Sequence, residues 1–169
     1  MNEPEIQFTL LKSTVFPTGI VSTKDFEALA AFALGHERVK GPVELSVDIT
    51  GHKRIRELNR RFRGVDRTTD VISFRNDDPH PGRRGGRPLP SGEGPRQPRV
   101  RVQGDLAINV HQAALQAKKM RHSTCREMRL LLIHGILHLL GYTDYEPRPR
   151  RRMFKRQNAL LRAWERKHP

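Results

Sequence analysis

Residues 130–142 read Leu-Leu-Leu-Ile-His-Gly-Ile-Leu-His-Leu-Leu-Gly-Tyr, and nearly every side chain in this stretch is apolar apart from two histidines. An apolar segment of this length must be largely buried, because few of its faces can meet water. Thr124 and Glu127 have the spacing of a capping box, and Gly141 suits the left-handed position that ends many helices. The sequence therefore predicts a buried helix that begins at Thr124 and ends before Gly141.

The segments around this helix predict the rest of the fold. Four of them have the β-branched, partly alternating composition of strands: residues 6–11, 43–50, 71–74 and 104–110. Four others carry apolar residues at helical spacing: residues 23–40, 55–62, 111–120 and 153–164. We expect an α+β fold in one domain spanning residues 1–169, with a small mixed sheet of about four strands and about five helices.

One stretch breaks this pattern. Residues 76–103 hold six of the twelve prolines together with five glycines and six arginines, and they show neither a helical nor a strand period. Such a composition is typical of a loop. We expect a long, flexible and basic loop here.

The charge balance points to polyanionic partners. The 169 residues include 32 Lys or Arg against 18 Asp or Glu, for a formal net charge of +14. This excludes an acidic or neutral surface and favours RNA or DNA, which bind cations by releasing counterions. The alternative is an arginine-rich surface that is merely solvated. Charge alone does not choose between RNA and DNA.

Cysteine usage and hydropathy indicate the compartment. Cys125 is the single cysteine and has no partner for an internal disulfide. The N-terminal residues lack the basic and apolar regions of a secretory signal, and residues 130–142 fall short of the ~20 that span a bilayer. We expect a cytoplasmic protein with no membrane partner.

The two histidines of the buried helix suggest a metal site. His134 and His138 are four positions apart, which places both rings on one helical face within reach of one ion. If the chain reverses at Gly141, Asp144 can return as a third ligand and leave a fourth position for water, as in catalytic zinc sites. Tyr145 and Glu146 are the competing third ligands.

Two other interpretations remain open at this point. The histidines can instead be core residues that bond to backbone carbonyls, with Asp144 supporting a turn. A peptidase is the other alternative, but helical zinc peptidases carry a general-base Glu directly after the first His, where this chain has Gly135. A hydrolase of peptides or small molecules is therefore disfavoured.

The chain resembles a known family in three segments. Residues 134–142 resemble the signature of the YbeY-type bacterial endoribonucleases, which act in rRNA maturation. Residues 57–74, which run from Glu-Leu-Asn to Thr-Asp-Val-Ile-Ser-Phe, are similar to that family's other signature, and residues 104–106 resemble its next strand. The likeness covers about Val43 to Tyr142. It implies a single α+β domain, a zinc-type metal site and RNA as substrate.

The resemblance also suggests roles for single residues. His134 and His138 match the family's first two metal-binding histidines, whereas its third histidine is replaced by Asp144. Arg63 stands where the family keeps a functionally important arginine, and a guanidinium there can steady negative charge on a phosphoryl transition state. We therefore expect Arg63 and His134 to be catalytic, with His134, His138 and Asp144 holding one Zn²⁺ or another divalent ion.

Other side chains are weaker candidates. Asp70 and Ser73 lie in the same signature, but turn capping and strand hydrogen bonds explain them as well. Tyr142 can stack on a base or pack in the core. His111, His122 and Cys125 have no matching partners and receive no chemical role.

These observations lead to one functional hypothesis and one principal alternative. The resemblance implies a single-strand-directed, metal-dependent endoribonuclease that acts in 16S rRNA 3′-end maturation and in ribosome quality control. The implied partner is rRNA or a ribosomal subunit, without specificity for DNA. The alternative is a catalytically weak RNA-binding factor in ribosome assembly.

Overall fold

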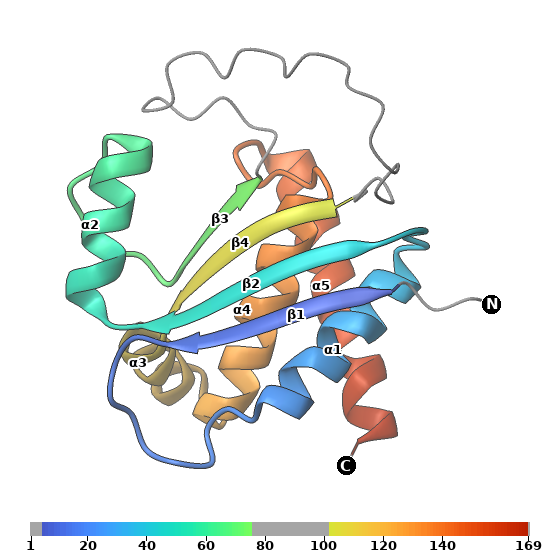
Figure 1. Ribbon diagram of the computed structural model, residues 1–169, viewed down its shortest axis with the longest axis horizontal. Coiled ribbons are helices and arrows are strands. Elements are labelled where there is room, and N and C mark those ends of the chain that lie inside the picture. Colours follow the sequence, from blue (N-terminus) through green and yellow to red (C-terminus); the bar gives the residue numbers. More distant parts are fainter. Residues whose placement is uncertain (1–4, 76–101, 169) are drawn as a thin grey trace, which may run out of the picture.

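A four-stranded mixed sheet forms the centre of the protein, in the strand order β1-β2-β4-β3. The computed structural model describes residues 5–75 and 102–168. The strands are β1 (Ile6–Lys12), β2 (Val43–Thr50), β3 (Val71–Arg75) and β4 (Val102–Asn109). β2 pairs in parallel with both β1 and β4, and β3 runs antiparallel to β4 at the edge (Figure 1).

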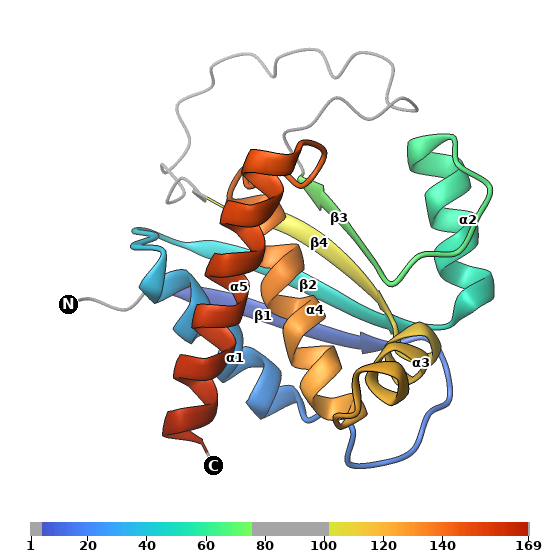
Figure 2. The ribbon, with the colours of Figure 1, turned by 180° about the vertical axis from the view of Figure 1, so that it is seen from behind.

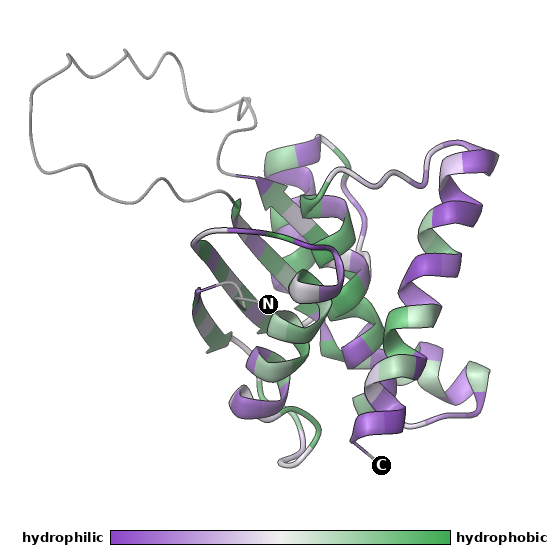
Figure 3. Ribbon diagram, turned by 90° about the vertical axis from the view of Figure 1, so that its right-hand side faces the viewer, coloured by the Kyte–Doolittle hydropathy of each residue, from purple (hydrophilic) through white to green (hydrophobic). Residues whose placement is uncertain are grey.

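Most helices lie on one face of this sheet (Figure 2). They are α1 (Thr23–His36), α3 (Val110–Met120), α4 (Thr124–Leu139) and α5 (Pro147–Lys167). Alternate residues of β2 point toward them and are fully buried: Val43, Leu45, Val47 and Ile49. α4 contacts α1, α3, α5 and the sheet, so its apolar sequence places it at the centre of the core. Figure 3 shows hydrophilic residues along the outside of the helices.

The remaining helix, α2 (His52–Arg63), has its own small core. Ile55 packs with Ile72 and Ala107, and the partly buried Leu58 and Phe74 complete this cluster. Ala107 alternates with Leu106 and Ile108, which belong to the main core, so α2 packs on the opposite face of the sheet. α2 and α5 therefore belong to different layers.

The structure confirms the expected α+β fold and corrects several boundaries. Residues 102 and 103, expected in the loop, are instead the first residues of β4 and pair with Val43 and Glu44. The cap of α4 is Ser123, whose hydroxyl accepts from the Arg126 amide, rather than Thr124. α5 already begins at Pro147, because proline is well suited to the first turn of a helix. Residues 76–101 of the expected loop lie outside the described residues.

The length and composition of the helices show whether any of them could span a membrane. Within residues 5–75 and 102–168, no helix combines the length and the apolar character needed to cross a bilayer. The longest helix, α5, is strongly cationic on its outer face.

Candidate metal centre

α4 and the turn that follows it bring His134, His138 and Asp144 together, as expected. The Nε2 atoms of the two histidines are 3.0 Å apart. Gly141 follows the helix with a φ of 91°, a conformation that favours glycine, and reverses the chain. The Asp144 carboxylate then lies 3.9 Å from Nε2 of His134 through one oxygen and 3.9 Å from Nε2 of His138 through the other.

The other ring nitrogens show which tautomer each histidine adopts. Nδ1 of His134 lies 2.7 Å from Oε1 of Gln157, and Nδ1 of His138 lies 3.0 Å from the Tyr142 carbonyl oxygen. Because these oxygens only accept hydrogen bonds, both Nδ1 atoms must carry the proton and donate it. In the neutral rings, two Nε2 lone pairs therefore face each other at 3.0 Å. That contact is repulsive unless a cation lies between them.

The distances between these atoms fit a bound metal ion. Ligand bonds of ~2.0–2.2 Å in tetrahedral geometry place neighbouring ligand atoms roughly 3.3–3.6 Å apart. The distances between the three side chains, 3.0 and 3.9 Å, bracket this range. The side chains of His134, His138 and Asp144 are 14%, 21% and 32% exposed, so the cluster has a side open to solvent. The three residues can therefore hold a metal ion.

The surroundings favour the neutral, metal-binding form of His138. Burial lowers its pKa most, and the neighbouring His134 lowers it further, while Asp144 and the hydrogen bond to Tyr142 act in the opposite direction. Arg63 adds a smaller lowering of the same pKa. A depressed pKa keeps the ring free to bind a cation at neutral pH.

Arg63 therefore lies within electrostatic range of His138. Arg63 is the last residue of α2, and Gly64 caps the helix with a φ of 70°. The Arg63 side chain is exposed, and no carboxylate among residues 5–75 and 102–168 pairs with it. Its guanidinium is thus available to an anion near His138.

The weaker candidates have structural partners or lie outside the cluster. Asp70 accepts from the Val71 amide at 2.8 Å and from the Gln116 side chain at 2.9 Å, so it caps a turn and joins it to α3. Ser73 lies in β3 opposite Leu106. Of the competing third ligands, Tyr145 is 81% exposed and Glu146 is the N-cap of α5.

Sequence reasoning missed the residues that orient the ligands. Gln157 is only 3% exposed and lies on the buried face of α5, where a polar residue interrupts the apolar series from Met153 to Leu160. A polar residue within this apolar series is the sequence signal that could have identified Gln157 as a functional residue. A buried amide without a partner is costly, so its bond to His134 satisfies both groups.

A second group of residues anchors the turn that supports His138. The Tyr142 hydroxyl donates to Glu37 at 3.0 Å, and Arg156 of α5 pairs with the same carboxylate. Tyr142 therefore ties the end of α4 to the end of α1, and it packs against the main core, which is one of its two expected roles.

Packing also explains the residue between the histidines. A Cβ atom at Gly135 would lie 2.8 Å from Cδ2 of Leu106, a core residue that is 2% exposed. The helix approaches β4 too closely for any side chain there. The general-base Glu of helical zinc peptidases does not fit at this position, so the structure supports the argument against a peptidase.

Comparisons with known proteins agree with this architecture. The family model described as Endoribonuclease YbeY matches residues 19–165. An endoribonuclease YbeY of Roseiflexus castenholzii is 39% identical over 146 residues, covering 85% of this chain and 84% of that protein. One of Acetivibrio thermocellus is 35% identical over 140 residues, covering 81% and 83%. A solution structure from Thermotoga maritima shares the fold with a TM-score of 0.56 at 24% identity, over 96% of this chain and 94% of that one. The chain therefore belongs to the endoribonuclease YbeY family.

Proposed function

We propose that this chain is a metal-dependent endoribonuclease that cleaves single-stranded RNA at the centre formed by His134, His138 and Asp144. Membership in the YbeY family supports the RNA-cleaving activity. We further propose that one Zn²⁺ ion is bound per chain and that the substrate is rRNA, in 16S 3′-end maturation and ribosome quality control. The proposal includes a cytoplasmic location, for which the single cysteine is the support.

The observation that carries the proposal is the arrangement of the two rings. The hydrogen bonds at both Nδ1 atoms direct two lone pairs toward one point, and the Asp144 carboxylate lies beside that point. Core histidines bonded only to carbonyls would not need an acid 3.9 Å from each remaining nitrogen. A cation satisfies all three groups at once.

The residues of the chain divide the chemistry between them. A divalent ion held there would supply Lewis-acid polarisation of a phosphoryl oxygen and activation of a water or hydroxyl nucleophile. His134 and His138 are fixed in orientation by their Nδ1 partners. Arg63 supplies a positive charge for the scissile phosphate, which gains negative charge as the bond breaks.

Metal content and RNA cleavage test the centre together. We expect one equivalent of metal in the parent, and loss of both the metal and the cleavage of a single-stranded RNA in His134→Ala and Asp144→Ala. RNA binding should survive in both variants. A parent that cleaves RNA equally well after complete removal of metal would contradict the proposal.

A neighbouring arginine provides a control for Arg63. Arg63→Gln should lower kcat by roughly 10²- to 10³-fold without changing the metal content, as loss of a charge-stabilising donor does elsewhere. Arg61→Gln removes the same charge from the same helix, where Arg61 lies over the Phe62 ring, and should change kcat little. Equal losses in the two variants would assign the effect to general charge.

The carboxylate at position 144 is the observation that favours a second candidate function. The first two histidines match the family signature, whereas Asp144 takes the position of its third histidine, so a catalytically weak RNA-binding assembly factor remains the competing function. It predicts salt-sensitive RNA binding in the parent without metal-dependent cleavage. If cleavage occurs, a 2′,3′-cyclic phosphate end or its opened form would identify the 2′-hydroxyl as nucleophile, and a free 3′-hydroxyl would identify water.

A further inference from the structure

The first turns of α5 carry a group of four arginines, here named the α5 arginine patch: Arg148, Arg150, Arg151 and Arg152. The first turn of this helix contains no acidic residue, and Glu146 at the N-cap makes no side-chain capping bond. Cations near the positive end of a helix dipole are unfavourable. The helix dipole therefore opposes positive charge in the first turn of α5, where the patch begins.

Two ion pairs link α5 to other helices, and neither involves an arginine of the patch. Arg156 pairs with Glu37, and Arg126 pairs with Glu165 at 2.7 Å. All four side chains of the patch are exposed, and no carboxylate in the described part of the chain forms an ion pair with any of them. The patch is thus a concentrated positive charge without an internal counter-charge.

Two members of the patch reach the surroundings of the metal centre. The Arg150 guanidinium lies 5.4 Å from the Phe154 ring centroid, and that ring is 5.9 Å from the ring of His134. Arg152 lies 5.7 Å from the ring of Tyr142, whose carbonyl oxygen holds His138. A single residue, Phe154 or Tyr142, therefore separates these arginines from His134 and His138.

Three arginines of the patch also lie on one side of the helix. Arg148, Arg151 and Arg152 have helical i, i+3 and i+4 spacing, and Lys155 adds the i+7 position. All are exposed, so they form a stripe along the outer face of α5. Such a stripe can follow a chain of phosphates.

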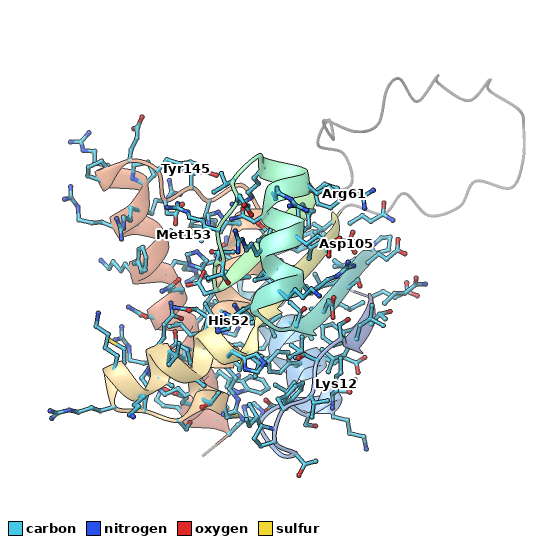
Figure 4. All side chains as sticks on the ribbon, turned by 90° about the vertical axis from the view of Figure 1, so that its left-hand side faces the viewer. Lys12, His52, Arg61, Asp105, Tyr145 and Met153 are labelled. Carbon is cyan, nitrogen blue, oxygen red and sulfur yellow. The ribbon has the colours of Figure 1, made fainter. Side chains whose placement is uncertain are left out.

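An exposed aromatic residue stands in the chain between Asp144 and the first arginine of the patch. Tyr145 follows the ligand Asp144 and is 81% exposed. Figure 4 shows Tyr145 at the end of the molecule where α5 begins. An exposed aromatic ring beside arginines is the arrangement on which the bases of single-stranded nucleic acid stack.

We propose that Tyr145 and the α5 arginine patch bind the RNA strand as it leaves the metal centre, with a base on the Tyr145 ring and successive phosphates on the arginines. This inference rests on the proposed function and adds the path of the substrate. Figure 1 shows α2, which ends at Arg63, and the first turns of α5 on opposite sides of β3. The proposed path therefore runs from the end of α2, past the centre, to the first turns of α5.

Salt-dependent binding of a fluorescent single-stranded RNA tests the charged part of the path. Arg148→Gln with Arg151→Gln removes the two arginines of the patch for which the described residues show no ring contact, unlike Arg150 and Arg152. The slope of log K against log salt should become shallower by about 1.4, or about 0.7 for each lost phosphate contact. Binding should weaken about tenfold or more at low salt.

A matched double variant controls for net charge. Lys118→Gln with Lys119→Gln removes the same charge from the last turn of α3, where the helix dipole favours cations and thus explains them. This control should keep the parent slope. Equal loss of slope in both double variants would overturn the proposal.

Thermal stability separates a structural role from a binding role. Loss of Arg148 and Arg151 should leave Tm equal to or above that of the parent, because it relieves repulsion with the helix dipole. A lower Tm together with weaker RNA binding would overturn the proposal.

Tyr145→Leu tests the stacking contact by a different signature. Affinity should fall about fivefold or more while the salt slope stays unchanged, because stacking releases no counterions. Unchanged affinity would remove Tyr145 from the path.

Failure of the inference can be told apart from failure of the proposed function. Cleavage of a two- or three-nucleotide RNA by the parent tests the metal centre alone, since so short a strand does not extend along α5. If the parent cleaves this RNA but the variants of the patch bind long RNA normally, only the inference fails. If the parent cleaves no RNA of any length, the proposed function fails, and the salt slopes still decide the binding path.

Discussion

Oε1 of Gln157 in α5 lies 2.7 Å from Nδ1 of His134 in α4, so a buried amide decides which nitrogen of that ring is free for a metal ion. His138 receives the same orientation from the Tyr142 carbonyl oxygen. The two ligands are thus held by different kinds of partner, one that mutation can remove and one that belongs to the backbone. Such outer partners fix the orientation of a metal-binding ring and raise its basicity, so their loss weakens metal binding.

Gln157→Leu should therefore weaken Zn²⁺ binding by about 10- to 100-fold, because the His134 ring loses the acceptor that fixes its tautomer. Competition with a chromophoric chelator measures this affinity. Gln157→Glu keeps an acceptor and should restore most of it. Parent-like affinity in the leucine variant would show that His134 is held by packing alone.

The fold and the proximity of His134, His138 and Asp144 were predictable from sequence because both depend on local patterns. Helical periodicity and the glycine at position 141 are readable along the chain, and together they bring Asp144 back to His138. Gln157 and Glu37 were not identified, because their partners are distant in sequence. Gln157 is 23 residues from His134, and Glu37 is 105 residues from Tyr142.

The misplaced boundaries have local causes. A loop composition continues up to the first residues of β4, so only the pairing with β2 shows that Val102 and Gln103 belong to the strand. Ser123 and Thr124 are both good capping residues, and the hydroxyl that reaches the Arg126 amide decides between them.

Asp144→His should shift the metal preference of the centre. A neutral imidazole in place of the carboxylate removes one negative charge and a hard oxygen ligand, which favours Zn²⁺ over Mn²⁺. We expect the ratio of the Mn²⁺ to the Zn²⁺ dissociation constant to rise by roughly an order of magnitude. Titration of both metals into parent and variant measures the ratio. An unchanged ratio would indicate that Asp144 does not contact the ion.

Tyr142→Phe should destabilise the protein by about 1.5–3 kcal/mol, because the hydroxyl donates to the charged Glu37 in a partly buried network. Tyr145→Phe removes a hydroxyl from a side chain that is 81% exposed and should change stability by less than about 0.5 kcal/mol. Urea denaturation of both variants gives the comparison. Similar stabilities would mean that the Glu37 contact contributes nothing beyond solvation.

Glu127→Gln should make stability less dependent on pH. Burial raises the pKa of Glu127 above its ordinary value of 4.5, and His122 at 3.0 Å opposes this only in part. A raised folded pKa means that the folded state binds the proton more tightly than the unfolded state. The stabilisation of the folded state by Glu127 is therefore fully present below pH 4.5 and is lost as pH rises through the folded pKa.

The comparison is the unfolding free energy of parent and Glu127→Gln from pH 4 to neutrality. As pH rises, the unfolding free energy of Glu127→Gln should increase relative to that of the parent. The difference between Glu27→Gln, on the exposed face of α1, and the parent should stay constant. A variant that instead loses stability relative to the parent with rising pH would show that the ion pair with His122 outweighs burial.

Gly135→Ala should destabilise the protein, although alanine is the better helix former. The new Cβ would lie 2.8 and 3.0 Å from the two Cδ atoms of Leu106, which is only 2% exposed, so the leucine or the helix must shift within a packed core. Overpacking of this kind costs about 1–3 kcal/mol, against a helix-propensity gain of at most ~1 kcal/mol.

Gly35→Ala in α1 is the matched control, because a Cβ at Gly35 meets nothing within 4 Å. Gly35→Ala should raise the free energy of unfolding by about 0.5–1 kcal/mol, because alanine has the higher helix propensity. Combining Gly135→Ala with Leu106→Val removes a methylene where the new methyl arrives, and should recover part of the loss. If Gly135→Ala is as stable as Gly35→Ala, α4 can move away from β4, and the close approach does not explain why a glycine separates the two histidines.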